Sequence, residues 1–442
     1  MARACAGLCL SSGSRVAIVG GGPAGSFAAL HLLRFAHQLS LPLTVTIFER
    51  KDFRRRGPEG CNKCAGILST RAVQGLRELG LQIPERLVMA RLEGYVLHLA
   101  SRALEIAQPE PDRTIISVYR GGGPRCADLA QDVSFDAWLL DEARAAGAEV
   151  VAANVRKISA GARMKVTTDA KQEAFDLIFL ANGVNAHPPA LEGVAYRPPR
   201  TEVMAQDELA LDKPLTLAQR TQAHVYVGQQ ARLIFGALIP KGDLLNVSLL
   251  GHGLRGDPIG DFLQRVDCRW LKGAGCRRLC GCRPRIAVTP AQRPFADRFV
   301  AVGDAAVTRL YKDGIGSALA TARQAAWTAL YAGISQAAFA RHYGPLCRSI
   351  AWDNHIGQLL FWPWQGRQSW LNRLWERGWR HVLETEQALP VHRRYAHQAL
   401  WSMLTGDDSY ARIARRALHP AMIGVFLRSL LGREGPGKGA TR

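Results

Sequence analysis

Apolar residues along the chain form short unbroken runs separated by segments of helical periodicity. The runs at residues 15–19, 43–48 and 175–181 are rich in β-branched residues and predict buried strands of a parallel sheet. Apolar positions after Gly25 and again up to about residue 330 recur at helical spacing. Strands that alternate with helices in this way predict an α/β fold.

The pattern changes in the second half of the chain. Short alternating strands at 224–227, 232–238 and 244–250 predict an antiparallel insertion. Another buried strand, 297–302, returns the chain to the first sheet, and helical periodicity dominates from residue 341. The predicted organisation is a discontinuous nucleotide-binding domain (14–190 plus 286–340), an antiparallel substrate domain (191–285), a helical C-terminal region (341–432) and a disordered tail (433–442).

Several shorter elements are also predicted. Ser69 is a suitable N-cap for a helix, and residues 135–146 have one apolar helical face. Residues 149–155 and 164–168 predict a hairpin before the strand at 175–181.

The first strand ends in a glycine-rich turn that opens a helix. Gly20, Gly22 and Gly25 have the spacing G-x-G-x-x-G, which suits a tight turn, a backbone approach to pyrophosphate and close helix–strand packing. The next strand ends at Glu49, where an acidic side chain can hold the ribose of an adenine dinucleotide. The alternative is a glycine-rich turn that binds nothing. Strand, helix, second strand and acid together favour a Rossmann-like dinucleotide-binding domain.

The charge balance points to an anionic partner. The 442 residues carry a formal net charge of +20, which attracts nucleic acid, anionic lipid or an acidic substrate or protein. No secretory signal and no apolar run long enough to span a bilayer is apparent. Ten cysteines without an export signal are typical of reduced thiols, so we expect a cytoplasmic protein that can associate peripherally with membranes.

Three separated motifs resemble the FAD-binding fold shared by para-hydroxybenzoate hydroxylase and the geranylgeranyl reductases. They are the glycine turn with Glu49, the strand that ends at Ala181-Asn182-Gly183, and Gly303-Asp304 after the late strand. The resemblance covers residues 14 to 330 and implies an FAD cofactor. It implies that the late Gly-Asp contacts the ribityl and pyrophosphate region, and that a helix N-terminus faces the flavin ring. The cofactor-binding residues it implies are Gly20, Gly22, Pro23, Ala24, Gly25, Glu49, Arg50, Cys64, Ala65, Gly66, Arg120, Ala181, Gly183, Gly303, Asp304, Gly314, Ile315 and Gly316.

Within this fold the chain is most similar to the geranylgeranyl reductase group. Cys64-Ala65-Gly66 resembles their Cys-Gly-Gly turn, and the segment 235–249 resembles their strand pair over the substrate cavity. Arg120, ahead of Phe135-Asp136, resembles their arginine before a helix. Ala237 departs from the family pattern, which has an aromatic residue there. Flavin halogenases carry Trp–Ile–Pro in a similar region, and Ile239-Pro240 occurs here without the tryptophans, so halogenation is disfavoured.

The cysteines leave three interpretations open. Cys61 and Cys64 precede the flavin-facing turn, and Cys268, Cys276, Cys280 and Cys282 form a second set whose spacing fits no standard zinc or iron–sulfur pattern. Scattered free thiols are the favoured interpretation. A redox thiol pair, with thiolate pKa values lowered by Lys63 and nearby arginines, is the second. A metal site formed by Cys61, Cys64, Cys280 and Cys282 is the least favoured.

The C-terminal region from Arg341 is basic, with 15 Lys and Arg against 7 Asp and Glu, and holds seven of the ten tryptophans. It predicts either a helical cap with a solvated basic face or an interfacial surface that docks on anionic lipid. Nucleic acid is disfavoured because no nucleic-acid-binding fold accompanies the charge.

The sequence therefore favours an FAD-dependent oxidoreductase that reduces or dehydrogenates a C=C bond of an isoprenoid or other lipid-like substrate through flavin N5. The alternatives are an FAD-dependent monooxygenase and a non-catalytic FAD-bearing protein at a membrane or RNA. Cys61, Cys64 and Lys241 are the residues considered for catalysis, and none is an evident proton donor. No second nucleotide fingerprint is apparent, so the expected electron donor is NAD(P)H bound transiently or an acidic ferredoxin-like protein.

Overall fold

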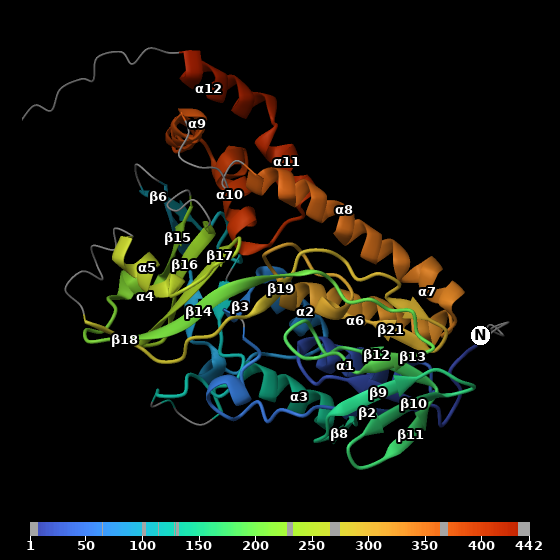
Figure 1. The fold of residues 1–442 in the computed structure, drawn as a ribbon. Helices are drawn as coiled ribbons and strands as arrows, with labels where there is room; N and C mark the ends of the chain where they lie inside the picture. The colour runs from blue at the N-terminus through green and yellow to red at the C-terminus, as the bar shows by residue number, and fades with distance from the viewer. Residues whose placement is uncertain are drawn as a thin grey trace, which may run out of the picture.

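We describe a computed structural model of the chain (Figure 1). Three of the predictions above concern residues outside the described part of the chain. These residues are Cys64, Cys268 and the predicted disordered tail. The structure describes residues 8–63, 65–99, 103–113, 115–127, 129, 132–227, 233–265, 275–362 and 370–431.

A six-stranded sheet forms the centre of the first half of the fold. Its order is β20-β21-β12-β1-β2-β8, with all neighbours parallel except the edge strand β20. The predicted buried strands become β1, β2, β12 and β21, which confirms the α/β fold. The strands are β1 (Arg15–Val19), β2 (Thr44–Phe48), β8 (Glu149–Val151), β12 (Leu177–Leu180), β20 (Phe295–Ala296) and β21 (Phe299–Ala301).

Side chains of β1 alternate between two cores. Val16 and Ile18 pack against the helical layer, whereas Ala17 and Val19 pack against a second sheet on the opposite face. Both faces of β1 are therefore buried, as expected for a central parallel strand. The helical layer consists of α1 (Pro23–Gln38), α2 (Thr70–Glu78), α3 (Phe135–Ala145) and α6 (Gly314–Tyr331).

The second sheet corrects the predicted hairpin. The segment before residue 152 does not pair with residues 164–168, because β8 joins the central sheet beside β2. The hairpin partner of residues 164–168 is instead the segment that starts at Val155. The four strands, in the order β11-β10-β9-β13, are β9 (Val155–Ser159), β10 (Met164–Thr168), β11 (Gln172–Phe175) and β13 (Ala190–Glu192).

An eight-stranded sheet forms the other half of the fold (Figure 1). It contains the predicted antiparallel strands, together with residues 94–98 and 103–107, which the sequence pattern assigned to the nucleotide-binding part. The domain boundaries themselves stay a prediction. A separate three-stranded sheet consists of β3 (Ile67–Leu68), β4 (Ala90–Leu92) and β7 (Ile115–Ser117), which lie on either side of β5 and β6 in the sequence. The strands of the large sheet are β5 (Gly94–His98), β6 (Ala103–Ala107), β14 (Thr201–Leu211), β15 (Gln222–Tyr226), β16 (Leu233–Lys241), β17 (Leu244–Gly251), β18 (Cys276–Arg278) and β19 (Arg285–Ala287).

This sheet is covered on both faces. On one face β14, β16 and β17 pack with α5 (Pro258–Arg265), and α4 (Leu217–Thr221) precedes β15. On the other face Tyr95, Val225 and Phe235 share a core with the C-terminal helices. The C-terminal region is helical, as predicted. Its helices are α7 (Gln336–His342), α8 (Gly344–Phe361), α9 (Trp370–Glu386), α10 (Tyr395–Thr405), α11 (Tyr410–Ala417) and α12 (Pro420–Leu431).

Asp407 fixes the C-terminal region to the first half of the fold. Its carboxylate accepts from the backbone N–H of Thr70, at the start of α2, at 3.0 Å and from Nε1 of Trp401 at 3.2 Å. Trp401 is fully buried against Tyr95 of β5. A buried carboxylate at a helix N-terminus is stabilised by the orphan N–H groups and the helix dipole. None of the described helices combines the length and hydrophobicity needed to cross a bilayer.

Candidate functional site

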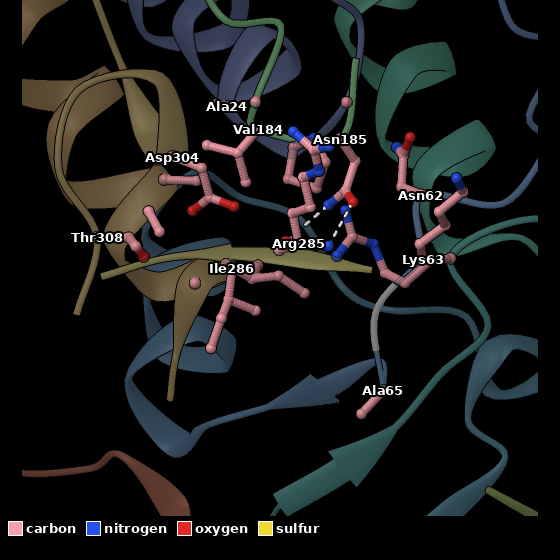
Figure 2. A pocket seen from close by; sticks show the side chains of 18 of the residues that line it. Ala24, Asn62, Lys63, Ala65, Val184, Asn185, Arg285, Ile286, Asp304 and Thr308 are labelled. Carbon is pink, nitrogen blue, oxygen red and sulfur yellow. Dashed lines mark hydrogen bonds between the residues drawn. The ribbon is translucent and has the colours of Figure 1, made fainter. Parts of the chain in front are cut away.

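A cavity of about 310 Å³ lies between the six-stranded and eight-stranded sheets. One end is lined by the glycine turn, Glu49 and Asp304, and the other by side chains of β5, β15 and β16. In Figure 2, Asp304 and Thr308 lie on one side of the space, and Asn62 and Lys63 lie on the other. The strand and turn motifs that are far apart in the sequence thus converge on a single cavity.

The glycine turn is built to leave its backbone exposed. Gly20 has φ of +106°, and a Cβ there would lie 2.6 Å from the carbonyl oxygen of Ala181. A Cβ at Gly25 would overlap the carbonyl oxygen of Gly20. Gly22, the N-cap of α1, lines the cavity, and its Cβ would approach only Nδ2 of Asn62, at 3.2 Å. The N-terminal N–H groups of α1 therefore meet the cavity as an anion-binding surface.

Glu49 holds this turn in place. Its carboxylate accepts from the backbone N–H of Gly21 at 2.7 Å and from that of Lys51 at 2.8 Å. Glu49 also lines the cavity at the end of β2, where the sequence predicted a ribose-binding acid. The carboxylate is thus fixed by the chain itself before any ligand arrives.

Arg120 and Asp136 form a buried ion pair beside the turn. Nη2 of Arg120 donates to Oδ2 of Asp136 at 3.0 Å, and Nε donates to Oδ1. Nδ2 of Asn62 donates to the same carboxylate. This bidentate geometry keeps the guanidinium of Arg120 rigid at the cavity wall.

The segment after β21 forms the opposite wall. Gly303 has φ of +61°, and a Cβ there would lie 2.6 Å from Cβ of Ala24, so only glycine allows this approach to α1. Burial raises the pKa of Asp304 above its usual range. Asp313 caps α6, accepting from the N–H of Gly316 at 3.2 Å and from Oγ of Ser69, the N-cap of α2, at 2.8 Å. The cap directs the N-terminus of α6 into the cavity, where Gly314 and Ile315 line it.

Asp313 gives a pH-dependent prediction. Burial raises its pKa from 3.8 to about 6, so ionisation costs stability as pH rises through this interval and the full cost is present at pH 7. We expect Asp313→Asn, which keeps a suitable N-cap, to raise the free energy of unfolding at pH 7 by up to about 3 kcal/mol. Thermal melts should show little difference at pH 4, where the wild-type carboxyl is already protonated. Equal destabilisation at both pH values would contradict this.

Most residues predicted to bind the cofactor line the large cavity. Gly25 and Gly303 instead allow close packing behind it, Gly66 and Gly316 are not part of the wall, and Cys64 lies outside the described residues. Gly66 accepts from the N–H of Val118 at 2.7 Å with φ of +72°. The predicted residues that line the cavity are Gly20, Gly22, Pro23, Ala24, Glu49, Arg50, Ala65, Arg120, Ala181, Gly183, Asp304, Gly314 and Ile315.

The far end of the cavity is an apolar chamber beneath the eight-stranded sheet. Its wall alternates along β16, where Phe235, Ala237 and Ile239 face the cavity and Leu238 faces the opposite core. This period of two places the segment predicted to cover a substrate over the cavity. Other apolar residues of this chamber are Leu92, Tyr95, Met204, Ala223, Val225, Ile286 and Leu404.

Two features of the chamber were not predicted. Leu404 and Thr405 come from α10, so the C-terminal region closes the cavity as well as packing on it. Lys312 places an ammonium group here, with Nζ 4.3 Å from the ring centre of Phe235. Its position two residues before Gly314 was the available sequence signal, because Gly314 and Gly316 mark the start of a helix that faces the cavity.

Lys241 and Cys61 line a separate cavity of about 50 Å³. Lys241 is 2% exposed and its Nζ lies 3.2 Å from Oε1 of Glu208, so the ammonium is neutralised within the protein. Arg120 and Gln206 line both cavities and form the wall between them. Cys61 and Lys241, two of the three residues considered for catalysis, therefore line the small cavity and not the apolar chamber.

The thiols of the small cavity correct the redox hypothesis. Burial raises the pKa of Cys61 and Cys280 above the usual range and that of Cys282 to about 12, outweighing the attraction of Lys241 for the Cys61 thiolate. The prediction of a lowered thiolate pKa was wrong for Cys61, because desolvation dominates there. Cys64, the other thiol of that predicted pair, lies outside the described residues. Among the described cysteines there is no disulfide, and no described cluster of His, Cys, Asp or Glu could hold a metal ion.

The large cavity fits an adenine dinucleotide that carries a flavin. Its nucleotide end has exposed backbone at Gly22 and Gly183, with open space where a Cβ of Gly183 would lie. Oδ1 of Asn182, at the same end of β12, is buried and has no hydrogen-bond partner in the described part of the chain. A buried orphan acceptor is costly unless a ligand supplies a donor, so this end of the cavity is suited to a polar ligand.

The sequence matches no protein-family model and no curated protein. Solved structures do resemble the fold. A geranylgeranyl bacteriochlorophyll reductase-like protein from Thermoplasma acidophilum superposes with a TM-score of 0.66 at 15% identity, over 92% of this chain and 99% of that one. A mutant of halogenase PltM in complex with FAD gives 0.60 at 14% identity, over 95% and 90% of the two chains.

A flavoprotein/dehydrogenase from Cytophaga hutchinsonii gives a TM-score of 0.58 at 14% identity, over 91% of this chain and 98% of that one. Reductase-like and halogenase structures are similar to the chain to about the same degree, so the fold comparison does not support the low rank that the sequence gave to halogenases. The predicted fold is confirmed: the chain has the architecture of the FAD-dependent oxidoreductase and monooxygenase fold.

Proposed function

We propose that the chain is an FAD-dependent oxidoreductase that acts on apolar small molecules. The observation that carries this proposal is the single cavity, which joins the glycine turn of a dinucleotide-binding sheet to an apolar chamber. A dinucleotide placed along the first part would direct its ring system towards the chamber. Ligand sites of this kind combine an apolar lining with a few placed polar groups.

The chain's own residues would hold FAD in the following way. The N-terminus of α1 at Gly22 would face the pyrophosphate, Glu49 the adenosine ribose, and Asp304 the ribityl chain. The N-terminus of α6 at Gly314 would face the flavin ring and favour negative charge there. When bound, FAD supplies hydride or oxygen chemistry that amino acids lack. The sheet and α10 exclude water from the chamber by apolar packing.

The finer proposal is that the chain reduces or dehydrogenates a C=C bond of an isoprenoid or other lipid-like substrate. Support comes from the apolar lining of the chamber and from the segment 235–249 over it. Under anaerobic conditions, reduced protein should be reoxidised by an unsaturated apolar compound such as geraniol, with one C=C bond reduced for each flavin reoxidised. Failure of all such compounds to reoxidise the flavin would argue against this reaction.

The second proposed activity is oxygenation or halogenation by flavin and O2. The resemblance to halogenase structures supports this second activity. Oxygen uptake driven by NAD(P)H that rises with substrate would support it, and dependence on bromide or chloride would separate halogenation from hydroxylation. The donor is proposed to be NAD(P)H or an acidic protein attracted by the net charge of +20, in which case flavin reduction should slow as salt increases.

We also propose that α8 docks on anionic membranes. Trp352, Leu359 and Trp362 lie on one face of this helix and its end, and are 69%, 73% and 74% exposed. Arg348, one turn before Trp352, is exposed as well. Aromatic and leucine side chains beside arginine suit the interface of an anionic bilayer.

Replacing Trp352, Leu359 and Trp362 by serine should reduce flotation with phosphatidylserine-containing vesicles by roughly tenfold or more. The reason is that burying each large apolar side chain contributes roughly 1.5–3 kcal/mol to the free energy of binding. Leu217→Ser, at an exposed leucine of α4, is the matched control and should float as the wild type does. Wild-type protein that does not float with the vesicles at low salt would contradict the proposal.

A further inference from the structure

We infer that Lys312 binds an anionic group of the substrate, so that the substrate is an apolar molecule carrying a carboxylate or similar anion. This inference rests on the proposed function, because it names the substrate class of the same chamber. It begins from the position of the ammonium group. Nζ of Lys312 lies over the ring of Phe235, 4.3 Å from its centre, on the chamber side of the cavity.

The ammonium group of Lys312 has no anionic partner among the residues that the structure describes. No carboxylate of these residues forms an ion pair with Lys312, and its Nζ lies over the face of Phe235. A cation in an apolar enclosure is costly unless it is paired. A single cation–π contact offsets part of this cost. The unpaired charge therefore points to a ligand that brings the anion.

The neighbouring charges do not neutralise Lys312. Arg309 is buried, and its Nη1 donates to backbone carbonyls of Gly406 and Asp408 rather than to a carboxylate. The carboxylate of Asp313 is used by Ser69 and the N–H of Gly316. Asp304, the other acid on this wall, has Arg120 as its charged neighbour. Two cations and the capping carboxylate leave an excess of positive charge at this end of the chamber.

The backbone holds Lys312 in place. Tyr311 and Asp313, on either side of it, have φ of +64° and +54°, a region that non-glycine residues rarely adopt. Such outliers concentrate at functional sites, where the surrounding structure maintains them. Burial, with a contribution from Arg309, lowers the pKa of Lys312 to about 8, so the group is still mainly charged at neutral pH. The result is a fixed cation rather than a mobile surface lysine.

The anion could come from two sources, the substrate or the reduced flavin. The contact with Phe235 favours the substrate, because Phe235 belongs to β16 of the chamber wall and not to the dinucleotide-binding turns. Gln206 and Ser248 also line the cavity, and Nε2 of Gln206 donates to Oγ of Ser248 at 2.8 Å, but both side chains are uncharged. We therefore expect an amphiphilic acid to bind with its apolar part along the sheet and its anionic group at Lys312.

Calorimetry with decanoic acid and 1-decanol tests this inference on the full-length protein, with and without added FAD. Wild type should bind the acid about tenfold or more tighter than the alcohol, as expected for a charge-assisted hydrogen bond. Lys312→Gln should bring this ratio close to one while leaving alcohol affinity unchanged, and Lys312→Arg should retain part of it. Lys165→Gln, at an exposed lysine of β10, is the matched control and should keep the wild-type ratio.

An unchanged acid-to-alcohol ratio in Lys312→Gln would overturn the inference. So would a wild type that does not prefer the acid. A shift of the flavin reduction potential in Lys312→Gln with an unchanged ratio would assign the cation to reduced flavin instead. Failure of the proposed function is distinguishable, since a protein that binds no FAD can still show the acid preference in the flavin-free titration.

Discussion

Gly22→Val should weaken FAD binding strongly while the protein stays folded. Gly22 lies in ordinary extended backbone, and its Cβ would approach only the side-chain amide of Asn62. A valine side chain there would project into the cavity beside the N-terminus of α1, where we place the pyrophosphate. We expect FAD affinity to fall by on the order of a hundredfold, equivalent to about 2.8 kcal/mol. Flavin fluorescence titration measures the loss directly.

Two other glycine variants make this result interpretable. Gly25→Ala should unfold the turn itself, because its Cβ would overlap the carbonyl oxygen of Gly20. Gly424→Val, at a helical position whose Cβ would meet nothing within 4 Å, should bind FAD as the wild type does. Normal FAD affinity in a folded Gly22→Val protein would show that the pyrophosphate does not lie at this turn.

Ala237→Trp should close the apolar chamber and stop turnover of apolar substrates. Ala237 is buried, faces the cavity, and is paired in register with Val225 and Ser248 on the two neighbouring strands. An indole at this position would occupy the space between these strands and the loop that carries Lys312. We expect ligand affinity and turnover to fall by about tenfold or more, with a stability cost of about 1–3 kcal/mol from overpacking. The flavin spectrum should be unaffected.

Two control variants separate the effect of side-chain volume in the chamber from other effects of the substitution. Ala237→Ser should keep most of the activity, since it adds one atom. Ala218→Trp adds the same indole at an exposed position of α4 and should change neither binding nor turnover. Undiminished decanol binding by folded Ala237→Trp protein would mean that apolar ligands do not use the chamber.

Local patterns predicted the nucleotide end of the site because each motif there is contiguous in the sequence. The glycines Gly20, Gly22 and Gly25 lie within six residues of one another, and the Cβ that Gly25 lacks would overlap the carbonyl oxygen of Gly20 in the same turn. The alternation of Phe235, Ala237 and Ile239 likewise follows from the period of a strand. The resemblance identified Arg120 as an arginine ahead of a helix, and the structure pairs it with Asp136 of that helix in a buried ion pair.

The chamber end could not be predicted in the same way, because it depends on contacts between distant segments. The parallel pairing of β5 with β15 joins residues about 128 apart, and no local signal specifies it. Leu404 reaches the cavity from α10, which the sequence placed in a separate region. The Cys61 thiol differs from expectation because burial raises its pKa, and burial is a property of the packed fold.

The visible absorption spectrum of the purified protein, after addition of FAD and removal of the excess, tests the central claim most directly. The account predicts flavin bands near roughly 370 and 450 nm that remain with the protein, bleach on anaerobic reduction with dithionite, and shift when an apolar acid is added. A protein that retains no flavin after this treatment would contradict the claim that the cavity between the two sheets is an FAD site.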